Sequence, residues 1–262
     1  MRHGISFLAY ALVAFSLTSY IIPHLLLRYL GKGVIRAAGG TYCRTGKTAN
    51  LSLCSITFDD GPDPRFTPAI LDILREYSCK ATFFVLAEKC QKYPELFERI
   101  RSEGHEIGLH GHNHLHPWLL GPLGTWRTLA TAAKAVFGDL PGHSDSIVRS
   151  GSCQSVLYRP PWGFWSLWNC LLTKNFTRVM WSIPGNDWKK TFDAYRVARN
   201  VLENLFPGAI ILLHDGGPYS GKTVAALPLI LDGIRNMGYV PVTVQELLGQ
   251  TNEATVSRDR VA

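Results

Sequence analysis

A regular alternation of short apolar runs with longer amphipathic runs, between residues 51 and 250 of this 262-residue chain, limits the fold more than any other feature. Apolar runs of about four to eight residues are typical of buried strands, and apolar residues at helical spacing are typical of helices. The predicted strands are Leu51–Phe58, Ala81–Leu86, His105–Leu109, Val156–Arg159, Arg178–Ile183, Ala209–Leu213 and Tyr239–Val242. The predicted helices are Pro68–Glu76, Pro94–Glu103, Thr125–Val136, Phe164–Thr173, Phe192–Leu205 and Val224–Met237. Strands that alternate with helices form parallel βαβ units. We therefore predict one α/β domain whose seven strands form a closed or nearly closed barrel.

The N-terminal segment is apolar and precedes this pattern. Residues 4–27 contain no Asp, Glu, Lys or Arg, and about 20 apolar residues are enough to cross the hydrocarbon core of a membrane. A cleavable signal peptide has a shorter apolar stretch of about 7–15 residues, so we favour a retained anchor over a removed signal. The predicted organisation is a transmembrane signal anchor at 1–30, a basic linker at 31–50, the folded domain at 51–250 and a flexible tail at 251–262.

The formal net charge of +7 belongs almost entirely to the part of the chain before Asp59, which has six Lys or Arg residues and no acidic residue. The rest of the chain is nearly neutral, so it lacks the basic surface that nucleic-acid binding requires, and we expect no nucleic-acid partner. The positive-inside rule would place the side flanked by Arg28, Lys32 and Arg36 in the cytoplasm, and the folded domain with it.

The cysteines do not decide the compartment. Six cysteines, at positions 43, 54, 79, 90, 153 and 170, are an even number and permit disulfides, but six cysteines allow fifteen pairings. Because no CxxC pair occurs, we expect no structural zinc site built from cysteine.

Two adjacent carboxylates end the first predicted strand. Asp59 and Asp60 are followed by Gly61 and Pro62, which permit a turn. Neighbouring strand residues point to opposite faces, so both carboxylates reach one site only if the chain bends there. Catalytic groups of α/β barrels lie where strands end. A turn or helix cap made by these side chains is the structural alternative.

Four histidines follow the third predicted strand within seven residues. They are His110, His112, His114 and His116, which form two pairs with i,i+4 spacing. On a helical turn, this spacing places two imidazoles on one face, as a zinc site requires. Two histidines and one carboxylate leave a position open for water, which is typical of catalytic metals. The cluster therefore predicts a metal site and leaves the choice of pair open.

Polar residues also end three later strands. Arg159 lies in the segment Tyr158–Gly163, whose prolines force a rigid exit from the strand. Asp187 and Trp188 follow the fifth predicted strand, and His214 ends the sixth. Each alone is compatible with a surface ion pair or a turn. Together, at one edge of a parallel sheet, they indicate a single site.

These segments resemble a known family. TFDDGP at 57–62, the paired histidines, RPPWG at 159–163, the Asp–Trp pair and LLHD at 212–215 stand in the order found in polysaccharide deacetylases of the NodB-homology type, carbohydrate esterase family 4. The resemblance covers about residues 52–248 and implies a distorted (β/α)₇ barrel, which agrees with the seven predicted strands. It also implies a role for each matching residue.

The implied metal ligands are Asp60, His110 and His114. The metal would most often be Zn²⁺, with Co²⁺, Ni²⁺ or Mn²⁺ as alternatives. Asp59 would act as the general base, tethered by Arg159, and His214 as the general acid, tuned by Asp187. The implied substrate-binding residues are Trp162, whose backbone N–H would bind the oxyanion, Pro161, Trp188 and Leu212.

The chain departs from the family pattern at two of these motifs. Gly111 stands where Ser or Thr usually follows the first histidine, and Pro184 stands where many members have the first Asp of an Asp-x-x-Asp-Trp motif. A polar stretch at 138–154 has the character of an insertion. Glu106–Gly108 align His110 with the first ligand of the family, so we favour His110 and His114 over His112 and His116.

The implied function is metal-dependent hydrolysis of a linear amide, the N-acetyl group of an amino sugar in a polysaccharide or envelope glycan. The alternatives are a deformylase or deacetylase of a lipid-linked amino sugar, an inactive carbohydrate-binding module, and a membrane protein whose histidines store metal. The presence of Asp59 and His214 argues against an inactive module. We expect a membrane-anchored monomer, with the cell-surface side slightly preferred and the cytoplasmic face as the alternative.

Overall fold

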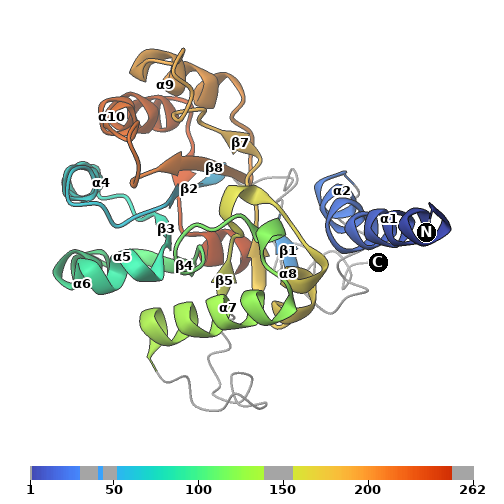
Figure 1. Cartoon of the computed structure of the whole chain (residues 1–262). Helices are drawn as coiled ribbons and strands as arrows, with labels where there is room; N and C mark the ends of the chain where they lie inside the picture. Colours follow the sequence, from blue (N-terminus) through green and yellow to red (C-terminus); the bar gives the residue numbers. More distant parts are fainter. Residues whose placement is uncertain (1, 30–40, 44–51, 139–155, 250–262) are drawn as a thin grey trace, which may run out of the picture.

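A curled, mostly parallel sheet flanked by helices forms the body of the protein (Figure 1). The computed structural model describes residues 2–29, 41–43, 52–138 and 156–249. Within these ranges the strands are β1 (Thr41–Cys43), β2 (Leu53–Asp59), β3 (Thr82–Val85), β4 (Glu106–Leu109), β5 (Leu157–Tyr158), β6 (Thr177–Val179), β7 (Ile183–Pro184), β8 (Ala209–His214) and β9 (Val240–Pro241). Their order is β1-β6-β5-β4-β3-β2-β8-β7, and β9 pairs with β2.

Helices follow most strands. They are α4 (Thr67–Glu76), α5 (Ala87–Lys92), α6 (Pro94–Ser102), η2 (Pro117–Leu119), α7 (Pro122–Phe137), η3 (Pro161–Gly163), α8 (Leu167–Leu172), α9 (Ala194–Glu203) and α10 (Gly221–Asn236). Proline begins several of them, because its missing N–H and fixed φ suit the first helical turn. The apolar sides of these helices cover the sheet, as in other α/β folds.

The central strands β2 and β8 are almost completely buried. Both are buried on both faces, as parallel strands covered by helices are, and one face of β2 carries the buried polar residues Ser55, Thr57 and Asp59. Phe58 of β2 stacks on Phe83 of β3, with ring centroids 5.0 Å apart, inside the larger core cluster. The parallel register pairs Asp59 of β2 with His214 of β8. The fold therefore brings two distant polar residues to the same edge of the sheet.

The predicted fold class, a distorted (β/α) barrel, is confirmed by this parallel, curled sheet, although several element boundaries differ. Strand β1 lies inside the segment assigned to the linker and pairs with β6. The predicted strand Arg178–Ile183 is two short strands, β6 and β7. The segments 30–40, 44–51, 139–155 and 250–262, which include most of the predicted linker and insertion and the whole predicted tail, lie outside the described residues.

The N-terminal segment is helical throughout its described part. It consists of α1 (Arg2–Ser16), a π-helical stretch η1 (Leu17–Ile21) and α2 (Ile22–Tyr29). Ala9–Leu26 has a mean hydropathy of 1.5 and is long and apolar enough to cross a membrane, a property that signal sequences share. Figure 1 shows α1 extending away from the domain, with α2 nearer to it, on the side of β1 and α8.

The cysteines whose side chains are described carry free thiols. They are Cys54, Cys79, Cys90 and Cys170. Burial raises the pKa of the first two thiols to about 12, as expected for inert thiols in an apolar core. Cys43 and Cys153 belong to the parts whose side chains are not described.

Candidate active site

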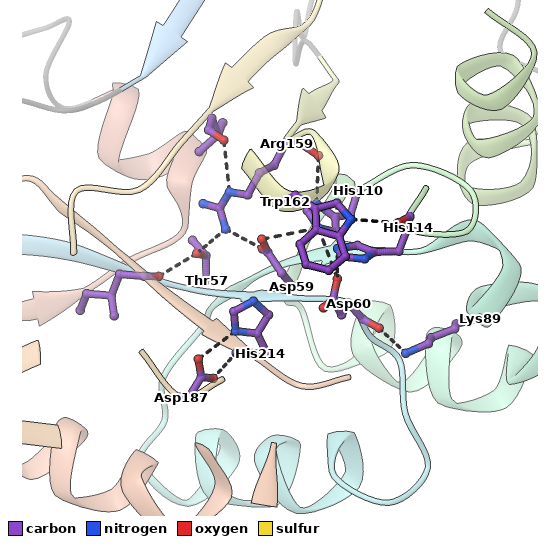
Figure 2. A network of polar contacts seen from close by, with 12 residues as sticks. Thr57, Asp59, Asp60, Lys89, His110, His114, Arg159, Trp162, Asp187 and His214 are labelled. Atoms are coloured by element: carbon purple, nitrogen blue, oxygen red, sulfur yellow. Dashed lines mark hydrogen bonds and ion pairs between the residues drawn. The ribbon is translucent and has the colours of Figure 1, made fainter. Parts of the chain in front are cut away.

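A pocket of about 430 Å³ opens where the carboxyl ends of β2, β4 and β8 meet. Nine of the eleven predicted site residues line it, and they are Asp59, Asp60, His110, His114, Trp162, Asp187, Trp188, Leu212 and His214. Figure 2 shows most of these side chains turned toward one another from separate strand ends. The predicted residues outside the pocket lining are Arg159, which lies behind Asp59, and Pro161.

Asp60, His110 and His114 form one cluster of potential metal ligands. Asp60 Oδ1 lies 3.3 Å from His110 Nε2 and 3.1 Å from His114 Nε2, and one ligand atom from each residue lies within 4.8 Å of the other two. The other pair of histidines is not part of this cluster. His116 instead uses its ring nitrogen to accept a hydrogen bond from the backbone N–H of Trp118.

The chemistry of these atoms fits a bound cation. His110 Nδ1 lies 2.9 Å from the carbonyl oxygen of Arg159, and it must donate because a carbonyl only accepts. In neutral His110, the Nε2 lone pair then faces a carboxylate oxygen. That oxygen, Asp60 Oδ1, is buried and accepts no hydrogen bond from the part of the chain that the structure describes. A divalent metal among these acceptors would satisfy all of them, with the Arg159 carbonyl fixing the ring of His110.

The protonation states also suit metal binding. Burial lowers the pKa of His114 to about 4, so its imidazole is neutral near pH 7 and keeps a lone pair for coordination. For Asp60, burial alone would raise the pKa, but the neighbouring imidazoles outweigh it and hold the pKa below its usual range. The cluster therefore offers a metal ion the ionised carboxylate of Asp60 and the neutral ring nitrogen of His114.

The histidine loop is not helical, contrary to the sequence-based expectation. Residues 110–116 follow β4 as a loop, in which Gly111 has φ 99° and His114 has φ 53°. A left-handed turn at Gly111 therefore brings the two rings together, in place of one helical turn. Asp60, with φ 72°, and Trp162, with φ 61°, are also left-handed. Non-glycine residues in this region are uncommon and gather at functional sites.

Asp59 is held by the guanidinium of Arg159. Arg159 Nη1 donates to Asp59 Oδ1 at 2.6 Å and lies 2.8 Å from Thr57 Oγ1. Both charged side chains are buried, and Asp59 Oδ2 lies 3.8 Å from His110 Nε2. The guanidinium also lies 4.0 Å above the ring of Phe84. These contacts hold Asp59 Oδ1 against Arg159 and leave Asp59 Oδ2 facing the metal-ligand cluster (Figure 2).

His214 also lines the pocket, and it is paired with a second carboxylate, that of Asp187. Its Nδ1 lies 2.9 Å from Asp187 Oδ1, and its backbone N–H donates to Asp187 Oδ2 at 2.7 Å. The hydroxyl of Thr223 donates to the same Oδ2 at 2.7 Å. Burial opposes a charge on His214, but the Asp187 carboxylate outweighs it and raises the pKa of His214 to about 9. His214 is therefore an imidazolium near pH 7.

The remaining predicted residues border the pocket in different ways. Trp162 and Trp188 are 60% and 40% exposed, and the ring of Trp188 meets His214 edge-on with centroids 5.2 Å apart. Leu212 is buried at the pocket wall. Pro161 is buried and packs next to Gly111, where it supports the histidine loop.

Some supporting residues were not identified from the sequence. Lys89 of α5 donates to the backbone carbonyl of Asp60 at 2.6 Å. Gly216 is required at the same place, because a Cβ there would lie 2.0 Å from that carbonyl oxygen. Asp215 is buried beside Gly61, and burial raises the pKa of Asp215 to about 7. Asp215 and Gly216 directly follow His214 in the sequence, so the motif around His214 could have drawn attention to them. No sequence pattern marks Lys89.

Comparison with known proteins places the chain in a family. A family model described as polysaccharide deacetylase matches residues 46–174. A peptidoglycan-N-acetylglucosamine deacetylase of Bacillus cereus is 36% identical over 203 residues, which cover 76% of this chain and 89% of that protein. The chain belongs to the polysaccharide deacetylase family. The predicted family and the prediction of a hydrolase are thereby confirmed.

Two further comparisons agree with this assignment. A chitooligosaccharide deacetylase of Sinorhizobium fredii is 32% identical over 216 residues, covering 76% of this chain and 94% of that protein. The crystal structure of a peptidoglycan N-acetylglucosamine deacetylase in complex with an aryl hydroxamate superposes with a TM-score of 0.66 and 33% identity. That superposition covers 77% of this chain and 90% of the other. The sequence comparison and the structural comparison therefore assign the chain to the same family.

Proposed function

We propose that this polysaccharide deacetylase removes the N-acetyl group from N-acetylglucosamine units of a glycan such as peptidoglycan or chitooligosaccharide. The observation that carries the proposal is the composition of one pocket. It holds a potential metal-ligand cluster, a carboxylate held by a buried arginine, and an imidazolium on a second carboxylate. Amide hydrolysis needs a polarised carbonyl, a base for water and an acid for the leaving amine, and this pocket holds a candidate for each.

Asp60, His110 and His114 are the residues that would hold the metal, for which we propose Zn²⁺. A divalent metal would supply a Lewis acid for the acetyl carbonyl and lower the pKa of a water molecule, to about 7 in the case of zinc. One carboxylate and two imidazoles match a catalytic zinc site with an open position. Co²⁺, Ni²⁺ and Mn²⁺ are alternative occupants with overlapping ligand preferences.

Asp59 is the proposed general base. Its Oδ1 is held by Arg159, so Oδ2 is the oxygen available to accept a proton from the attacking water. Arg159 fixes the orientation of the carboxylate and gives it a countercharge in a buried position. Trp162 lines the same pocket, and we assign its backbone N–H to the developing oxyanion.

His214 is the proposed general acid. The amine of the sugar is a poor leaving group as an anion, so its nitrogen must be protonated as the C–N bond breaks. Asp187 keeps His214 protonated near pH 7 and fixes its Nδ1, which leaves Nε2 to donate the proton. Leu212 offers an apolar wall for the acetyl methyl group, and the exposed rings of Trp162 and Trp188 offer faces for sugar stacking.

We also propose that the N-terminal helix anchors the enzyme in a membrane, on the side where envelope glycan is available. Its apolar span, Ala9–Leu26, has the length and composition required. Tethering raises the local concentration of enzyme near a surface-bound substrate without any new contact.

The proposal is tested by acetate release from metal-stripped full-length protein in detergent. We expect release from peptidoglycan or chitooligosaccharides to return when Zn²⁺ is added. Zn²⁺ should also raise the Tm, by linkage corresponding to about 2.7 kcal/mol at a hundredfold excess over Kd. His114→Asn should weaken both effects, whereas His116→Asn, a matched histidine outside the cluster, should preserve the Zn²⁺-induced shift of Tm. A metal-loaded protein that releases no acetate from these glycans would overturn the proposed function.

A pH profile tests the acid. Because His214 must be protonated and Asp187 raises its pKa to about 9, kcat/KM should decline as the pH rises through about 9. Asp187→Asn removes the stabilising charge, so the pKa of His214 should fall and the alkaline limb should move to lower pH. Thr223→Val, which removes only the hydroxyl bonded to Asp187, should move the limb much less. An alkaline limb that stays fixed in Asp187→Asn would exclude His214 as the acid.

A further inference from the structure

An exposed apolar surface follows the histidine loop. Leu119 of η2 is 77% exposed, and Leu123 and Trp126 of α7 are 57% and 48% exposed. The opposite side of α7 faces the core with Thr125, Leu129, Ala132 and Val136. Large apolar side chains that gather on one surface segment mark a contact site. We call Leu119, Leu123, Trp126 and the exposed Arg127 the η2–α7 face.

The N-terminal helix packs directly beside this face. The ring of Tyr20 lies 6.1 Å from that of Trp118, and the ring of His24 stacks on Phe164 at 4.5 Å. His24 is 7% exposed, so the domain covers this part of the helix. Trp118 is the residue immediately before Leu119. The η2–α7 face therefore continues from the surface that holds the helix.

The position of this contact along the helix sets the depth of the domain. The apolar span ends at Leu26, and Tyr20 lies six residues earlier, about 9 Å along an α-helix. The domain residues that contact Tyr20 and His24 therefore lie level with the last turns of the span. Interfacial apolar faces typically enter a membrane by about 5–10 Å, which is a similar depth.

The charges of the segment favour an anionic surface. Residues 107–138 contain no Asp or Glu, although acidic residues are frequent elsewhere in the domain. Arg127 and Lys134 are exposed on α7, and helical spacing puts them on the same side as Leu123 and Trp126. Exposed Leu and Trp side chains beside basic residues suit a membrane interface, where aromatic rings lie at the headgroup level and basic side chains reach anionic headgroups. Each basic residue near an anionic leaflet adds electrostatic attraction to the lipid headgroups.

We propose that the η2–α7 face lies on the bilayer that holds α1–α2, with Leu119, Leu123 and Trp126 in the interface and Arg127 on anionic phospholipid headgroups. The inference rests on the membrane anchoring proposed above and adds an orientation to it. The domain is then held at the membrane in two places, by the helix and by this face.

The orientation determines which substrates reach the pocket. A row of ring contacts runs from His24 through Phe164 and His116 to Trp162, with centroid distances of 4.5, 4.8 and 6.3 Å. Trp162 lines the pocket and lies 4.9 Å from His114. The pocket mouth is thus connected to the helix contact by packed rings. The fixed domain accordingly acts on glycan that lies next to the membrane surface.

Quenching by brominated lipid tests the face. Full-length protein is reconstituted into vesicles of phosphatidylcholine and phosphatidylglycerol in which the phosphatidylcholine carries bromine on its acyl chains. We expect the lipid to quench part of the tryptophan emission, and Trp126→Phe to lower the quenchable part. Trp188→Phe is the matched control, because Trp188 is similarly exposed at 40% but lies at the pocket. It should leave the quenchable part at the wild-type level.

A second set of variants tests the apolar and the basic contributions to the membrane contact. Leu119→Ser with Leu123→Ser should reduce the quenching of Trp126, whereas Leu229→Ser should not. Leu229 is 45% exposed on α10, which lies on the side of the domain away from α1 and α2 (Figure 1). Replacing phosphatidylglycerol by phosphatidylcholine, or Arg127 by Glu, should also lower the quenching.

The outcomes separate this inference from the proposals on which it rests. Retention of the chain on vesicles through an alkaline carbonate wash reports on the anchor alone, and acetate release from soluble chitooligosaccharide reports on the activity alone. A retained and active protein in which Trp126→Phe leaves the quenching unchanged would overturn the η2–α7 face. A chain released by the wash would overturn the anchor and the face together.

Discussion

Replacing Asp59 with Asn is expected to lower the rate of deacetylation by about 10²–10⁴-fold, the usual contribution of a positioned general base. Asparagine keeps the shape of the side chain and can still accept a hydrogen bond from Arg159. It cannot accept a proton from water near pH 7. The loss should therefore appear in kcat and kcat/KM to a similar extent, because the missing interaction belongs to the transition state. Steady-state acetate release by the zinc-loaded protein measures it.

Metal binding should survive this change, which distinguishes a base from a ligand. Asp59 is not among the three clustered ligands, so the Zn²⁺-induced rise in Tm should persist in Asp59→Asn. Asp63→Asn is a matched control, since Asp63 is also buried and paired with an arginine, Arg65, but does not line the pocket. It should keep activity near the wild-type level. Retention of more than about a tenth of the activity in Asp59→Asn would contradict the role of a general base.

The site residues could be predicted because parallel strands end at one edge of a sheet. Asp59, Asp60 and His214 stand at the ends of apolar runs, and the register that pairs Asp59 with His214 follows from adjacent parallel strands. The strand ends, together with the motif order, were enough to identify nine residues that line the pocket, but not Trp181 and Tyr219, which also line it.

The support around these residues was not predictable by the same reasoning. Lys89 and Thr223 come from helices α5 and α10 and bond to Asp60 and Asp187 across the fold. Their contacts depend on tertiary packing, and neither residue lies in a periodic or motif pattern. The histidine loop shows a different limit. The spacing suggested a helical turn and left two histidine pairs open, whereas the rings of His110 and His114 come together through a left-handed turn at Gly111.

Strands β1 and β7 were not predicted as separate strands. Strand β1 has three residues in a segment rich in Gly and basic residues, and β7 has two residues, one of them Pro184. Such segments carry too few residues to show a period of two. Their strand conformation comes from pairing with β6 and β8, long-range partners that local patterns do not reveal.

Replacing Arg159 with Met is expected to destabilise the fold by about 3–5 kcal/mol, because it leaves the buried carboxylate of Asp59 without its countercharge. Methionine fills much of the volume of the arginine stem but loses the contact of the guanidinium with the ring of Phe84, so the loss of stability combines the unpaired charge with that contact. Activity should fall as well, since nothing else among the described residues fixes Asp59 Oδ1. Urea unfolding of the metal-free protein gives the change in the free energy of unfolding.

A double-mutant cycle shows whether the loss arises from the ion pair. Asp59→Asn removes the charge that Arg159→Met would strand, so the two substitutions should be less than additive, with a coupling of about 0.5–3 kcal/mol. Arg178→Met provides the comparison, because Arg178 is equally buried but donates to backbone carbonyls and to Thr173, not to a carboxylate. The loss of stability caused by Arg178→Met should add to the loss caused by Asp59→Asn. If Arg159→Met and Asp59→Asn were also additive, the guanidinium would act through packing, and the buried charge pair would not be what holds the proposed base in place.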